Sequence, residues 1–552
     1  MKAALTILVF TFASFWGSLA QSATYYVDKN HPNASDANAG TSQLLPWSTI
    51  TKANATLGAG DTVFIKAGTY TAGTNNYVAP GNSGTVNNRI TYRNFGTDVV
   101  TIQQGSLAID LNGNDFVTVQ GLTFTMLDRF MQLRNSADFN IIDGNTFATV
   151  RNYSSWEGSR IWQNSDHNIL RNNTFKEYGL CSGANDQGAV IDIGLEDGTG
   201  DTSDFNLFEN NVFARGGHHV MGMYSRFNVI RNNYFYNDPW TAGKGNRTLY
   251  VVGTDANYTG HNLIENNRFG YSAVPCDADG VHGMMIANSN NIFRYNSLYH
   301  NNLNGLGLQV YDIDTSSNLI YNNTFFNNAF NPSATYGSAE KGAISLGKWN
   351  PPLVQSNMIM NNLFYSHPFD GGQPIGQNGA LRSNQTIANN FDGDVSGNPL
   401  FVNASTTPPA NKNDRTLPNL SLQSSSPAIN AGRNLTTVSS GCSGATISLV
   451  LANAKFFQDG TWGPAGETQA DWIAVGTVTN VKQIASISGN TVTLTSALSC
   501  SNGNDVWLYK DSSGRQVLQG SAPDAGAYES FGGGTNPPDT TPPAAPTGVV
   551  IN

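Results

Sequence analysis

Six short segments of this chain begin with polar side chains that could act as acids, bases or cationic binding groups, and each continues as an apolar stretch. The segments are 186–194, 217–225, 246–254, 280–288, 303–311 and 340–348. They contain His219, Arg247, His282 and Lys341. A neutral imidazole or amine accepts a proton, and a guanidinium neutralises a carboxylate. These four residues are therefore the predicted catalytic residues, acting on an anionic substrate.

Other side chains in or beside these segments could hold a metal or a sugar. Asp277 and Asp279 lie one residue apart in "CDADGVHG". Carboxylate oxygens are the ligands that Ca²⁺ prefers, so this pair is a predicted Ca²⁺ site, with an Asx turn as the alternative. Asp192 is expected to be a satisfied buried carboxylate. The predicted substrate-binding residues are His218, Asn304, Tyr224, Tyr250, Tyr311, Trp349 and Glu340.

A repeat spaces these segments along the chain. "HNILRNNTF", "FNLFENNVF", "RFNVIRNNYF", "HNLIENNRF" and "SNLIYNNTF" share the order Asn, apolar, two residues, Asn-Asn, one residue, Phe. The first Asn falls at 140, 168, 206, 228, 262, 291, 318 and 357, with a shortest spacing of 22. A fixed minimum spacing with longer insertions is typical of a solenoid, and the apolar residues lack a 3.6-residue period. The repeat predicts a β-solenoid with coils of about 22 residues.

The asparagines are predicted to be structural. Asn tolerates left-handed backbone angles at sharp turns, and stacked Asn side chains bond from coil to coil. The phenylalanines of the repeat should stack inward as a core column. Equivalent residues of stacked coils lie about 4.8 Å apart, so polar residues should form columns along a groove. Aligned by hand, one column is Gln187, His218, Arg247, Val281, Asn304 and Lys341, and the next is Gly188, His219, Thr248, His282, Gly305 and Gly342.

Composition agrees with a β-rich architecture and excludes some partners. Charged residues make up only 12% of the chain, and 57 of 552 residues are Gly, which is unusual for a helical protein. The net charge is −10 and no basic tract occurs, so nucleic acid is not an expected partner. A locally basic cleft could still bind an acidic polymer. No segment after the N-terminus is apolar enough to span a membrane.

The flanks of the repeat resemble a known family. "ITKANATLGAGDTVFIKAGTY" (50–70) resembles the opening coils of secreted right-handed parallel β-helix proteins of the pectate-lyase-like superfamily. "GNPLFVN" (397–403), "SPAINAG" (426–432) and "PDAGAYE" (523–529) are similar to its closing segments. The resemblance implies an all-β, single-stranded right-handed parallel β-helix (a solenoid) over 23–435 and 511–530. This superfamily hosts lyases, hydrolases, epimerases and non-catalytic surface proteins.

The remaining segments have other predicted roles. Residues 1–20 read as a secretory signal, with a membrane anchor as the alternative. A secreted, extracellular protein is therefore expected, with the periplasm or the cell surface as alternatives. Residues 436–510 are predicted to be a small inserted β module, stapled by a Cys442–Cys500 disulfide; Cys181 and Cys276 are a second possible pair. Residues 531–552 read as a Gly/Pro/Thr linker and the start of a further module.

The favoured function is a polysaccharide lyase that cleaves an acidic, uronate-containing polymer by β-elimination. Elimination requires a base for a carbon-bound proton and a cation for the neighbouring carboxylate. The resemblance implies Ca²⁺ with an Arg or Lys base. Asp277 and Asp279 would hold Ca²⁺, Lys341 or Arg247 would be the base, and His219 or His282 is the other possible base.

Three other functions remain open. A glycoside hydrolase needs two carboxylates, and Asp186, Asp279 and Glu340 are available; however, the Asp-Asp pair and downstream Gly-His-Gly of polygalacturonases are absent. A non-catalytic polysaccharide-binding or adhesive rod is the third possibility. An epimerase also stays open because it would share the proton abstraction, although a "DPH" triplet is absent. In each case the expected partner is an extended polysaccharide bound by a monomer.

Overall fold

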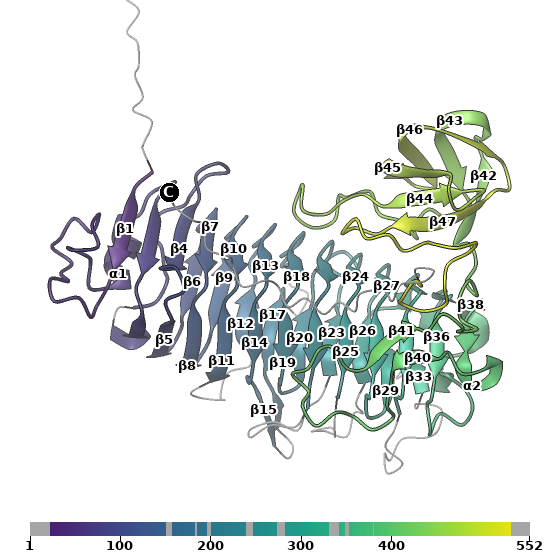
Figure 1. Cartoon of the computed structure of the whole chain (residues 1–552), viewed down its shortest axis with the longest axis horizontal. Helices are drawn as coiled ribbons and strands as arrows, with labels where there is room; N and C mark the ends of the chain where they lie inside the picture. Colours follow the sequence, from purple (N-terminus) through teal and green to yellow (C-terminus); the bar gives the residue numbers. More distant parts are fainter. Residues whose placement is uncertain are drawn as a thin grey trace, which may run out of the picture.

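The computed structural model describes residues 22–74, 76–150, 157–182, 185–195, 200–238, 247–272, 282–329, 342–347, 353–378 and 380–530. Three long parallel sheets run side by side along one axis, and each coil of the chain contributes one strand to each sheet in turn (Figure 1). The fold is the predicted right-handed parallel β-helix, followed by a small antiparallel barrel. No helix in these described ranges is long and apolar enough to cross a membrane.

The first sheet, sheet 1, has 13 parallel strands. They are β1 (Thr24–Val27), β2 (Thr62–Ile65), β4 (Ile90–Asn94), β7 (Val117–Gln120), β10 (Ile141–Asp143), β13 (Ile169–Arg171), β18 (Leu207–Glu209), β21 (Val229–Arg231), β24 (Leu263–Glu265), β27 (Ile292–Arg294), β31 (Leu319–Tyr321), β35 (Met358–Met360) and β38 (Thr386–Ala388).

Sheet 2 has 12 parallel strands and follows sheet 1 in each coil. They are β3 (Gly68–Thr71), β5 (Val100–Gly105), β8 (Thr123–Leu127), β11 (Thr146–Val150), β14 (Thr174–Lys176), β19 (Val212–Ala214), β22 (Tyr234–Tyr236), β25 (Arg268–Gly270), β28 (Ser297–Tyr299), β32 (Thr324–Phe326), β36 (Leu363–Tyr365) and β39 (Phe391–Asp392).

Sheet 3 has 10 parallel strands and includes the six segments that carry the predicted site. They are β6 (Ile109–Asn112), β9 (Met131–Arg134), β12 (Glu157–Ile161), β17 (Ala189–Ile193), β20 (His219–Met223), β23 (Arg247–Val252), β26 (His282–Ala287), β29 (Asn304–Leu308), β33 (Gly342–Gly347) and β37 (Ile375–Asn378).

Short elements surround these sheets. Helix α1 (Ile50–Thr56) lies at the N-terminal end, where Thr49 caps it by accepting a hydrogen bond from Lys52 N. The others are η1 (Ala72–Thr74), β15 (Leu180–Ser182), β16 (Asn185–Gln187), β30 (Thr315–Ser316), β34 (Val354–Gln355), η3 (Arg382–Asn384), α2 (Gly393–Ser396), β40 (Phe401–Asn403) and β41 (Asn419–Leu422).

The asparagine repeat forms two ladders along the solenoid. The first Asn of each repeat accepts a bond from the backbone of the preceding coil, as when Asn168 Oδ1 accepts from Asn140 N at 2.9 Å. The second residue of each Asn-Asn pair does the same, as when Asn211 Oδ1 accepts from Asn173 N at 2.9 Å. The left-handed turn residue is the first of the pair, with φ of 59° at Asn172. The predicted structural role of these residues is confirmed.

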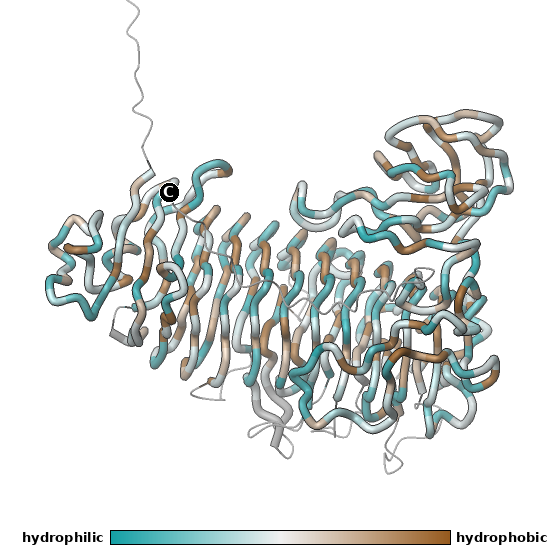
Figure 2. Tube along the Cα trace, in the orientation of Figure 1, coloured by the Kyte–Doolittle hydropathy of each residue, from teal (hydrophilic) through white to brown (hydrophobic). Residues whose placement is uncertain are grey.

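Inside the coils, the repeat phenylalanines stack as predicted. Phe147 and Phe175 have ring centroids 4.3 Å apart, and Phe213 and Phe235 have centroids 5.1 Å apart. All four are fully buried. Apolar stretches recur in successive coils along the solenoid (Figure 2), so the sheets enclose one continuous core.

An aspartate ladder runs beside the asparagine ladder and makes folding pH-dependent. Asp166 N donates to Asp138 Oδ1 at 2.8 Å, and Asp204 N donates to Asp166 Oδ1 at 2.7 Å. Burial, and then the neighbouring carboxylates, raise the pKa of Asp166 to about 7. Burial raises the pKa of Asp204 to about 6. At these two carboxylates the folded chain therefore holds more protons than the unfolded chain between pH 4 and 7.

Because these two carboxylates bind extra protons in the folded state, their contribution to stability is greatest at the acid end of this window and falls as pH rises through the raised pKa values. Burial lowers the pKa values of His300 and His367 to about 4, and these groups act in the opposite direction below pH 6.5. We therefore expect the thermal unfolding midpoint of wild type to fall relative to that of Asp166→Asn between pH 5 and pH 8. Asp166→Asn keeps an acceptor oxygen without the charge, so it should be the more stable protein at pH 8, by about 1 kcal/mol after screening by water. A wild-type midpoint that rises with pH, with no effect of Asp166→Asn, would contradict this.

The barrel at the C-terminal end lies against sheet 1 (Figure 1). Its closed order is β42, β43, β46, β45, β44, β47. Its strands are β42 (Thr436–Ser440), β43 (Ser443–Leu451), β44 (Trp472–Val475), β45 (Val481–Ser488), β46 (Thr491–Ser501) and β47 (Asp505–Lys510). The predicted Cys442–Cys500 disulfide is present. Residues 1–20, Cys276 and 531–552 lie outside the described residues, so the signal, the second disulfide and the linker stay predictions.

Two of the three outer faces of the later coils are covered by C-terminal segments. Apolar residues of sheet 1 such as Val229 and Leu263 pack with barrel residues such as Phe456 in one cluster. Outward residues of sheet 2 such as Tyr234 pack with Phe401 from β40 in another. Neither cluster includes a residue of sheet 3. Within the described part of the chain, neither of these C-terminal clusters covers the outer face of sheet 3.

Candidate functional site

The outer face of sheet 3 is shaped by a break in the usual strand alternation. In β20, Val220 and Met221 are consecutive and both belong to the main core. His219 and Gly222, on either side of them, therefore face outward. The same arrangement places Asp192 of β17 on the outer face, in register with Gly222.

The register differs by one residue from the predicted columns. His219 aligns with Arg247, and His282 aligns with Asn304, which in turn aligns with Gly342. The prediction that His218 shares a column with Arg247 was wrong. Because Val220 and Met221 both face the core, the apolar pattern fits two registers, and the predicted columns correspond to the one that the structure does not adopt.

Four polar side chains form one hydrogen-bonded chain across this face. Arg247 Nη1 lies 2.5 Å from His218 Nε2. His218 Nδ1 lies 3.1 Å from His219 Nδ1, and His219 Nε2 lies 2.8 Å from Asp192 Oδ1. Arg247, His219 and Asp192 are each buried to above nine-tenths. The structure thus joins three of the residues predicted for the site with Asp192.

The direction of each bond follows from the end groups. A guanidinium only donates and a carboxylate only accepts, so His218 Nε2 accepts from Arg247 and His219 Nε2 donates to Asp192. A neutral His218 then carries its proton on Nδ1 and donates it to His219 Nδ1. Burial, followed by the charge of Arg247, lowers the pKa of His218 well below its ordinary value of 6.5, so this neutral form is the one present at neutral pH.

Gly222 makes room for this arrangement. A Cβ at Gly222 would lie 2.3 Å from Asp192 Oδ1, 2.7 Å from His219 Nε2 and 2.7 Å from the Tyr224 hydroxyl. The hydroxyl of Tyr224 is 3.4 Å from His219 Nε2. Three polar groups, from β17, β20 and the residue that follows β20, therefore converge over one residue that has no side chain.

Aromatic rings wall the cluster. The Tyr250 ring lies 5.5 Å from the His218 ring and 5.3 Å from the His219 ring, and the Arg247 guanidinium is 5.3 Å above it. Tyr224 and Tyr250 are edge to face at 6.3 Å. With Val252, Met285 and Ala287 they form a small apolar cluster outside the main core. Two of the three predicted tyrosines, Tyr224 and Tyr250, therefore lie at the histidine pair.

Further charges extend the site toward the N-terminal coils. Arg160 of β12 aligns with Asp192, and Glu157 lies 3.5 Å from both Arg160 and Arg129. Burial raises the pKa of Glu157, with Arg160 opposing the rise and Asp192 adding to it. The Nε atoms of Arg160 and Arg247 are buried and have no hydrogen-bond partner within the described ranges. Buried donors of this kind are normally satisfied, so an anionic ligand suits both.

Other predicted residues lie apart from this cluster or outside the description. Asn304 is buried in β29, and Tyr311 lies beyond that strand, 46% exposed. His282 begins β26, and nothing is described of its side chain. Lys341, Glu340, Trp349, Asp277 and Asp279 lie outside the described residues. The predicted Ca²⁺ site therefore stays a prediction; the described residues contain no group of three or more His, Cys, Asp or Glu that could hold a metal.

Sequence reasoning assigned Asp192 only a structural role and did not single out Gly222. Neither residue stands out from the sequence of its own strand. They lie side by side only because of the exact register between β17 and β20. The spacing of an outward Asp one coil before a His-x-x-Gly stretch is the signal that could have identified them.

Comparisons with known proteins agree with the fold. Residues 192–392 match the family described as right handed beta helix region. No curated protein matches the chain. The solved structure of pectate lyase Pel9A is 15% identical with a TM-score of 0.45, covering 77% of this chain and 95% of that one. A polysaccharide lyase from Pseudopedobacter saltans is 15% identical with a TM-score of 0.42, covering 62% and 90%. The lacto-N-biosidase from Eubacterium ramulus is 13% identical with a TM-score of 0.39, covering 66% and 67%.

Proposed function

We propose that this chain is a secreted enzyme that cleaves an acidic, uronate-containing polysaccharide by β-elimination on the outer face of sheet 3. The observation that carries the proposal is the pairing of a buried arginine with the lone pair of a neutral histidine. Arg247 holds His218 Nε2 at 2.5 Å and still has a buried, unpaired Nε within the described part of the chain. A cation and a neutral base side by side are what elimination next to a carboxylate requires.

Substrate binding would expose the base. A uronate carboxylate is a stronger acceptor for the Arg247 guanidinium than a neutral imidazole, and it can bind two N–H groups at once. When the carboxylate accepts the hydrogen bond from Arg247 Nη1, that bond to His218 Nε2 is broken and the lone pair of Nε2 becomes free. It is released next to the carbon that bears the carboxylate, whose proton must be removed.

The proton and electrons then balance as follows. His218 Nε2 takes the proton from the carbon next to the carboxylate, the C–H electron pair forms the double bond, and the glycosidic C–O bond breaks. Tyr250, whose ring faces both imidazoles, is the group we assign to protonate the leaving oxygen. The imidazolium of His218 is stabilised by donating Nδ1–H to His219, which in turn donates to Asp192.

The described carboxylates favour elimination over hydrolysis. Hydrolysis needs one carboxylic acid and one carboxylate free to flank the scissile bond. Asp192 is engaged with His219, and Glu157 lies between Arg129 and Arg160. Neither is free for that role on the described part of this face. A row of outward side chains, one per strand at about 4.8 Å, also suits a linear polymer.

The test is incubation with pectate, alginate and glycosaminoglycan panels, following ultraviolet absorbance of unsaturated ends together with reducing ends. Elimination produces both signals in equal amounts. Reducing ends without unsaturation would establish hydrolysis instead, and binding without either signal would establish a binding rod. A chelator arm tests the predicted role of Asp277 and Asp279 in holding Ca²⁺.

The pH profile of cleavage tests the base. His218 must be neutral to accept a proton, and its pKa lies well below 6.5. Activity should therefore be present at neutral pH, persist below pH 6.5, and be lost only as pH falls through the lowered pKa. Arg247→Met removes the cation that helps to lower this pKa, so the acid limb of the remaining turnover should move upward. A wild-type acid limb above pH 6.5 would exclude His218 as the base.

A further inference from the structure

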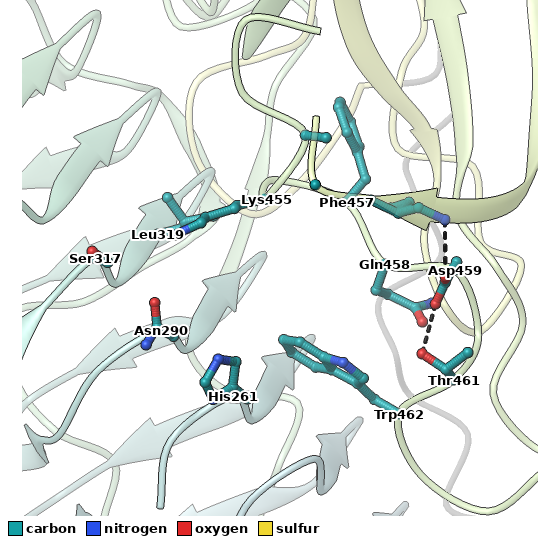
Figure 3. Close-up of a pocket in the computed structure, with 13 residues that line it drawn as sticks. His261, Asn290, Ser317, Leu319, Lys455, Phe457, Gln458, Asp459, Thr461 and Trp462 are labelled. Atoms are coloured by element: carbon teal, nitrogen blue, oxygen red, sulfur yellow. Dashed lines mark hydrogen bonds between the residues drawn. The ribbon is translucent and has the colours of Figure 1, made fainter. Parts of the chain in front are cut away.

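A cleft between the solenoid and the barrel is distinct from the face of sheet 3. It is a cavity of about 250 Å³ along the edge of sheet 1 (Figure 3). From the solenoid it is lined by His261, Asn290, Ser317 and Leu319, and from the barrel chiefly by Lys455, Phe457, Gln458, Asp459, Thr461 and Trp462. A volume of this size suits a single sugar ring rather than a long ligand.

The cleft is preformed because the barrel is fixed to the solenoid around it. Gly463 N donates to Phe227 O at 2.9 Å, next to the cleft residue Trp462. Tyr321 of β31 donates its hydroxyl to Phe456 O at 2.7 Å, next to Phe457. These two bonds join the barrel to the solenoid next to residues that line the cleft.

Several polar side chains of the cleft have no protein partner. The side chains of His261, Asn290, Ser317 and Lys455 make no hydrogen bond or ion pair with any residue that the structure describes. By contrast, Asp459 accepts bonds from Thr461 and Ile487 N, and these hold the loop in shape. In Figure 3 the unpaired side chains of His261, Asn290 and Ser317 lie on the solenoid side of the cavity, opposite Asp459 and Thr461. The unpaired imidazole, amide, hydroxyl and ammonium groups include both donors and acceptors of hydrogen bonds, and sugar hydroxyls can bond to either kind.

Trp462 supplies a stacking surface. Its ring is 6.1 Å from Phe227 at an interplanar angle of 59°, and 6.3 Å from His261 at 84°. Neither neighbour lies parallel to the indole, so neither occupies its face as a stacked partner. Lys455 is exposed and carries a positive charge without a carboxylate partner in the described ranges. A uronate ring could therefore lie against the indole with its carboxylate at Lys455.

We propose that this cleft is a second saccharide site, which binds one uronate unit of the polymer away from the cleaving face. The proposal rests on the proposed function for the class of polymer. Its effect is to tether the polysaccharide to the protein. Two weak contacts, one in the cleft and one on sheet 3, then act together on the same polymer. The inserted barrel then has a role: it supplies the aromatic and cationic walls of an anchoring site.

The test measures polymer binding in a His218→Ala background, where cleavage does not consume the ligand. Pectate, alginate and glycosaminoglycan are titrated calorimetrically against this protein and against versions that also carry Trp462→Ala or Lys455→Met. Loss of a charge-assisted contact is expected to weaken binding about tenfold. Lys482→Met, a barrel lysine outside the cleft, is the matched control and should leave binding unchanged.

The outcomes separate the two proposals. If Arg247→Met weakens binding in this background but Trp462→Ala and Lys455→Met do not, the second site is wrong and the proposed function stands. If the Lys482→Met control weakens binding as much as Lys455→Met, the effect is one of general charge and the second site is again wrong. If no uronate polymer binds any version, both proposals fail.

Discussion

Replacing Gly222 with alanine is expected to lower turnover at least about a hundredfold without unfolding the protein. The new Cβ would overlap Asp192 Oδ1 and the His219 imidazole at 2.3 and 2.7 Å. These are side-chain ends that can move, so the backbone keeps its fold. The relay from His218 to Asp192 cannot keep its bonds, and displacement of a positioned catalytic group by about 1 Å costs about 10²-fold. Steady-state turnover and thermal unfolding, measured together, check this.

Gly58→Ala is the matched control. A Cβ at Gly58 would meet only Asp61 Oδ2, at the ordinary distance of 3.8 Å. This variant should keep both turnover and stability. Full activity of Gly222→Ala would show that the Asp192–His219 contact has no part in the reaction, while loss of folding in Gly222→Ala alone would show that the residue is structural.

Arg294→Met should cause the largest loss of stability that a single substitution produces at the solenoid–barrel interface. Arg294 of β27 is fully buried, 2.7 Å from both Glu265 of β24 and Asp471 of the barrel. Its removal leaves two buried carboxylates without a cation, which typically costs about 3–5 kcal/mol. Denaturant unfolding at pH 7 measures the loss. Adding Glu265→Gln and Asp471→Asn should recover part of it, because the buried charges are then gone.

Arg134→Met provides the comparison. Arg134 pairs with Asp110 at 2.9 Å, but the two side chains are 29% and 21% exposed. Water screens such a pair, so this substitution should cost less than about 1 kcal/mol. If Arg294→Met were as mild as Arg134→Met, the barrel would not depend on the buried pair for its place on the solenoid.

The fold was predictable because the residues that build its turns repeat in the sequence. Asn168 and Asn206 each bond to the backbone of the coil before them, so the distance between them along the chain is the length of one coil. The inward phenylalanines follow at a fixed interval. A ladder of this kind must use the same residue in every coil, and that requirement makes it visible in one sequence.

The candidate site was predictable only in part, because its geometry depends on register to a single residue. The six segments do form strands of one sheet, and His218, His219, Arg247, Tyr224 and Tyr250 lie together on it. The columns were wrong because consecutive inward residues in β20 break the alternation that fixes register. The role of Asp192 depends on its contact with His219 in the next coil. The sequence around Asp192 does not indicate which residue of that coil it will contact.

The central claim is that a carboxylate on Arg247 releases His218 to abstract a proton. The most direct measurement is the rate of unsaturated-end formation by wild-type protein and by His218→Ala, alongside the affinity of each for the same uronate polymer. The account predicts that His218→Ala binds within a few-fold of wild type and forms unsaturated ends at least about a hundredfold more slowly. Unsaturated ends formed by His218→Ala at the wild-type rate would contradict it.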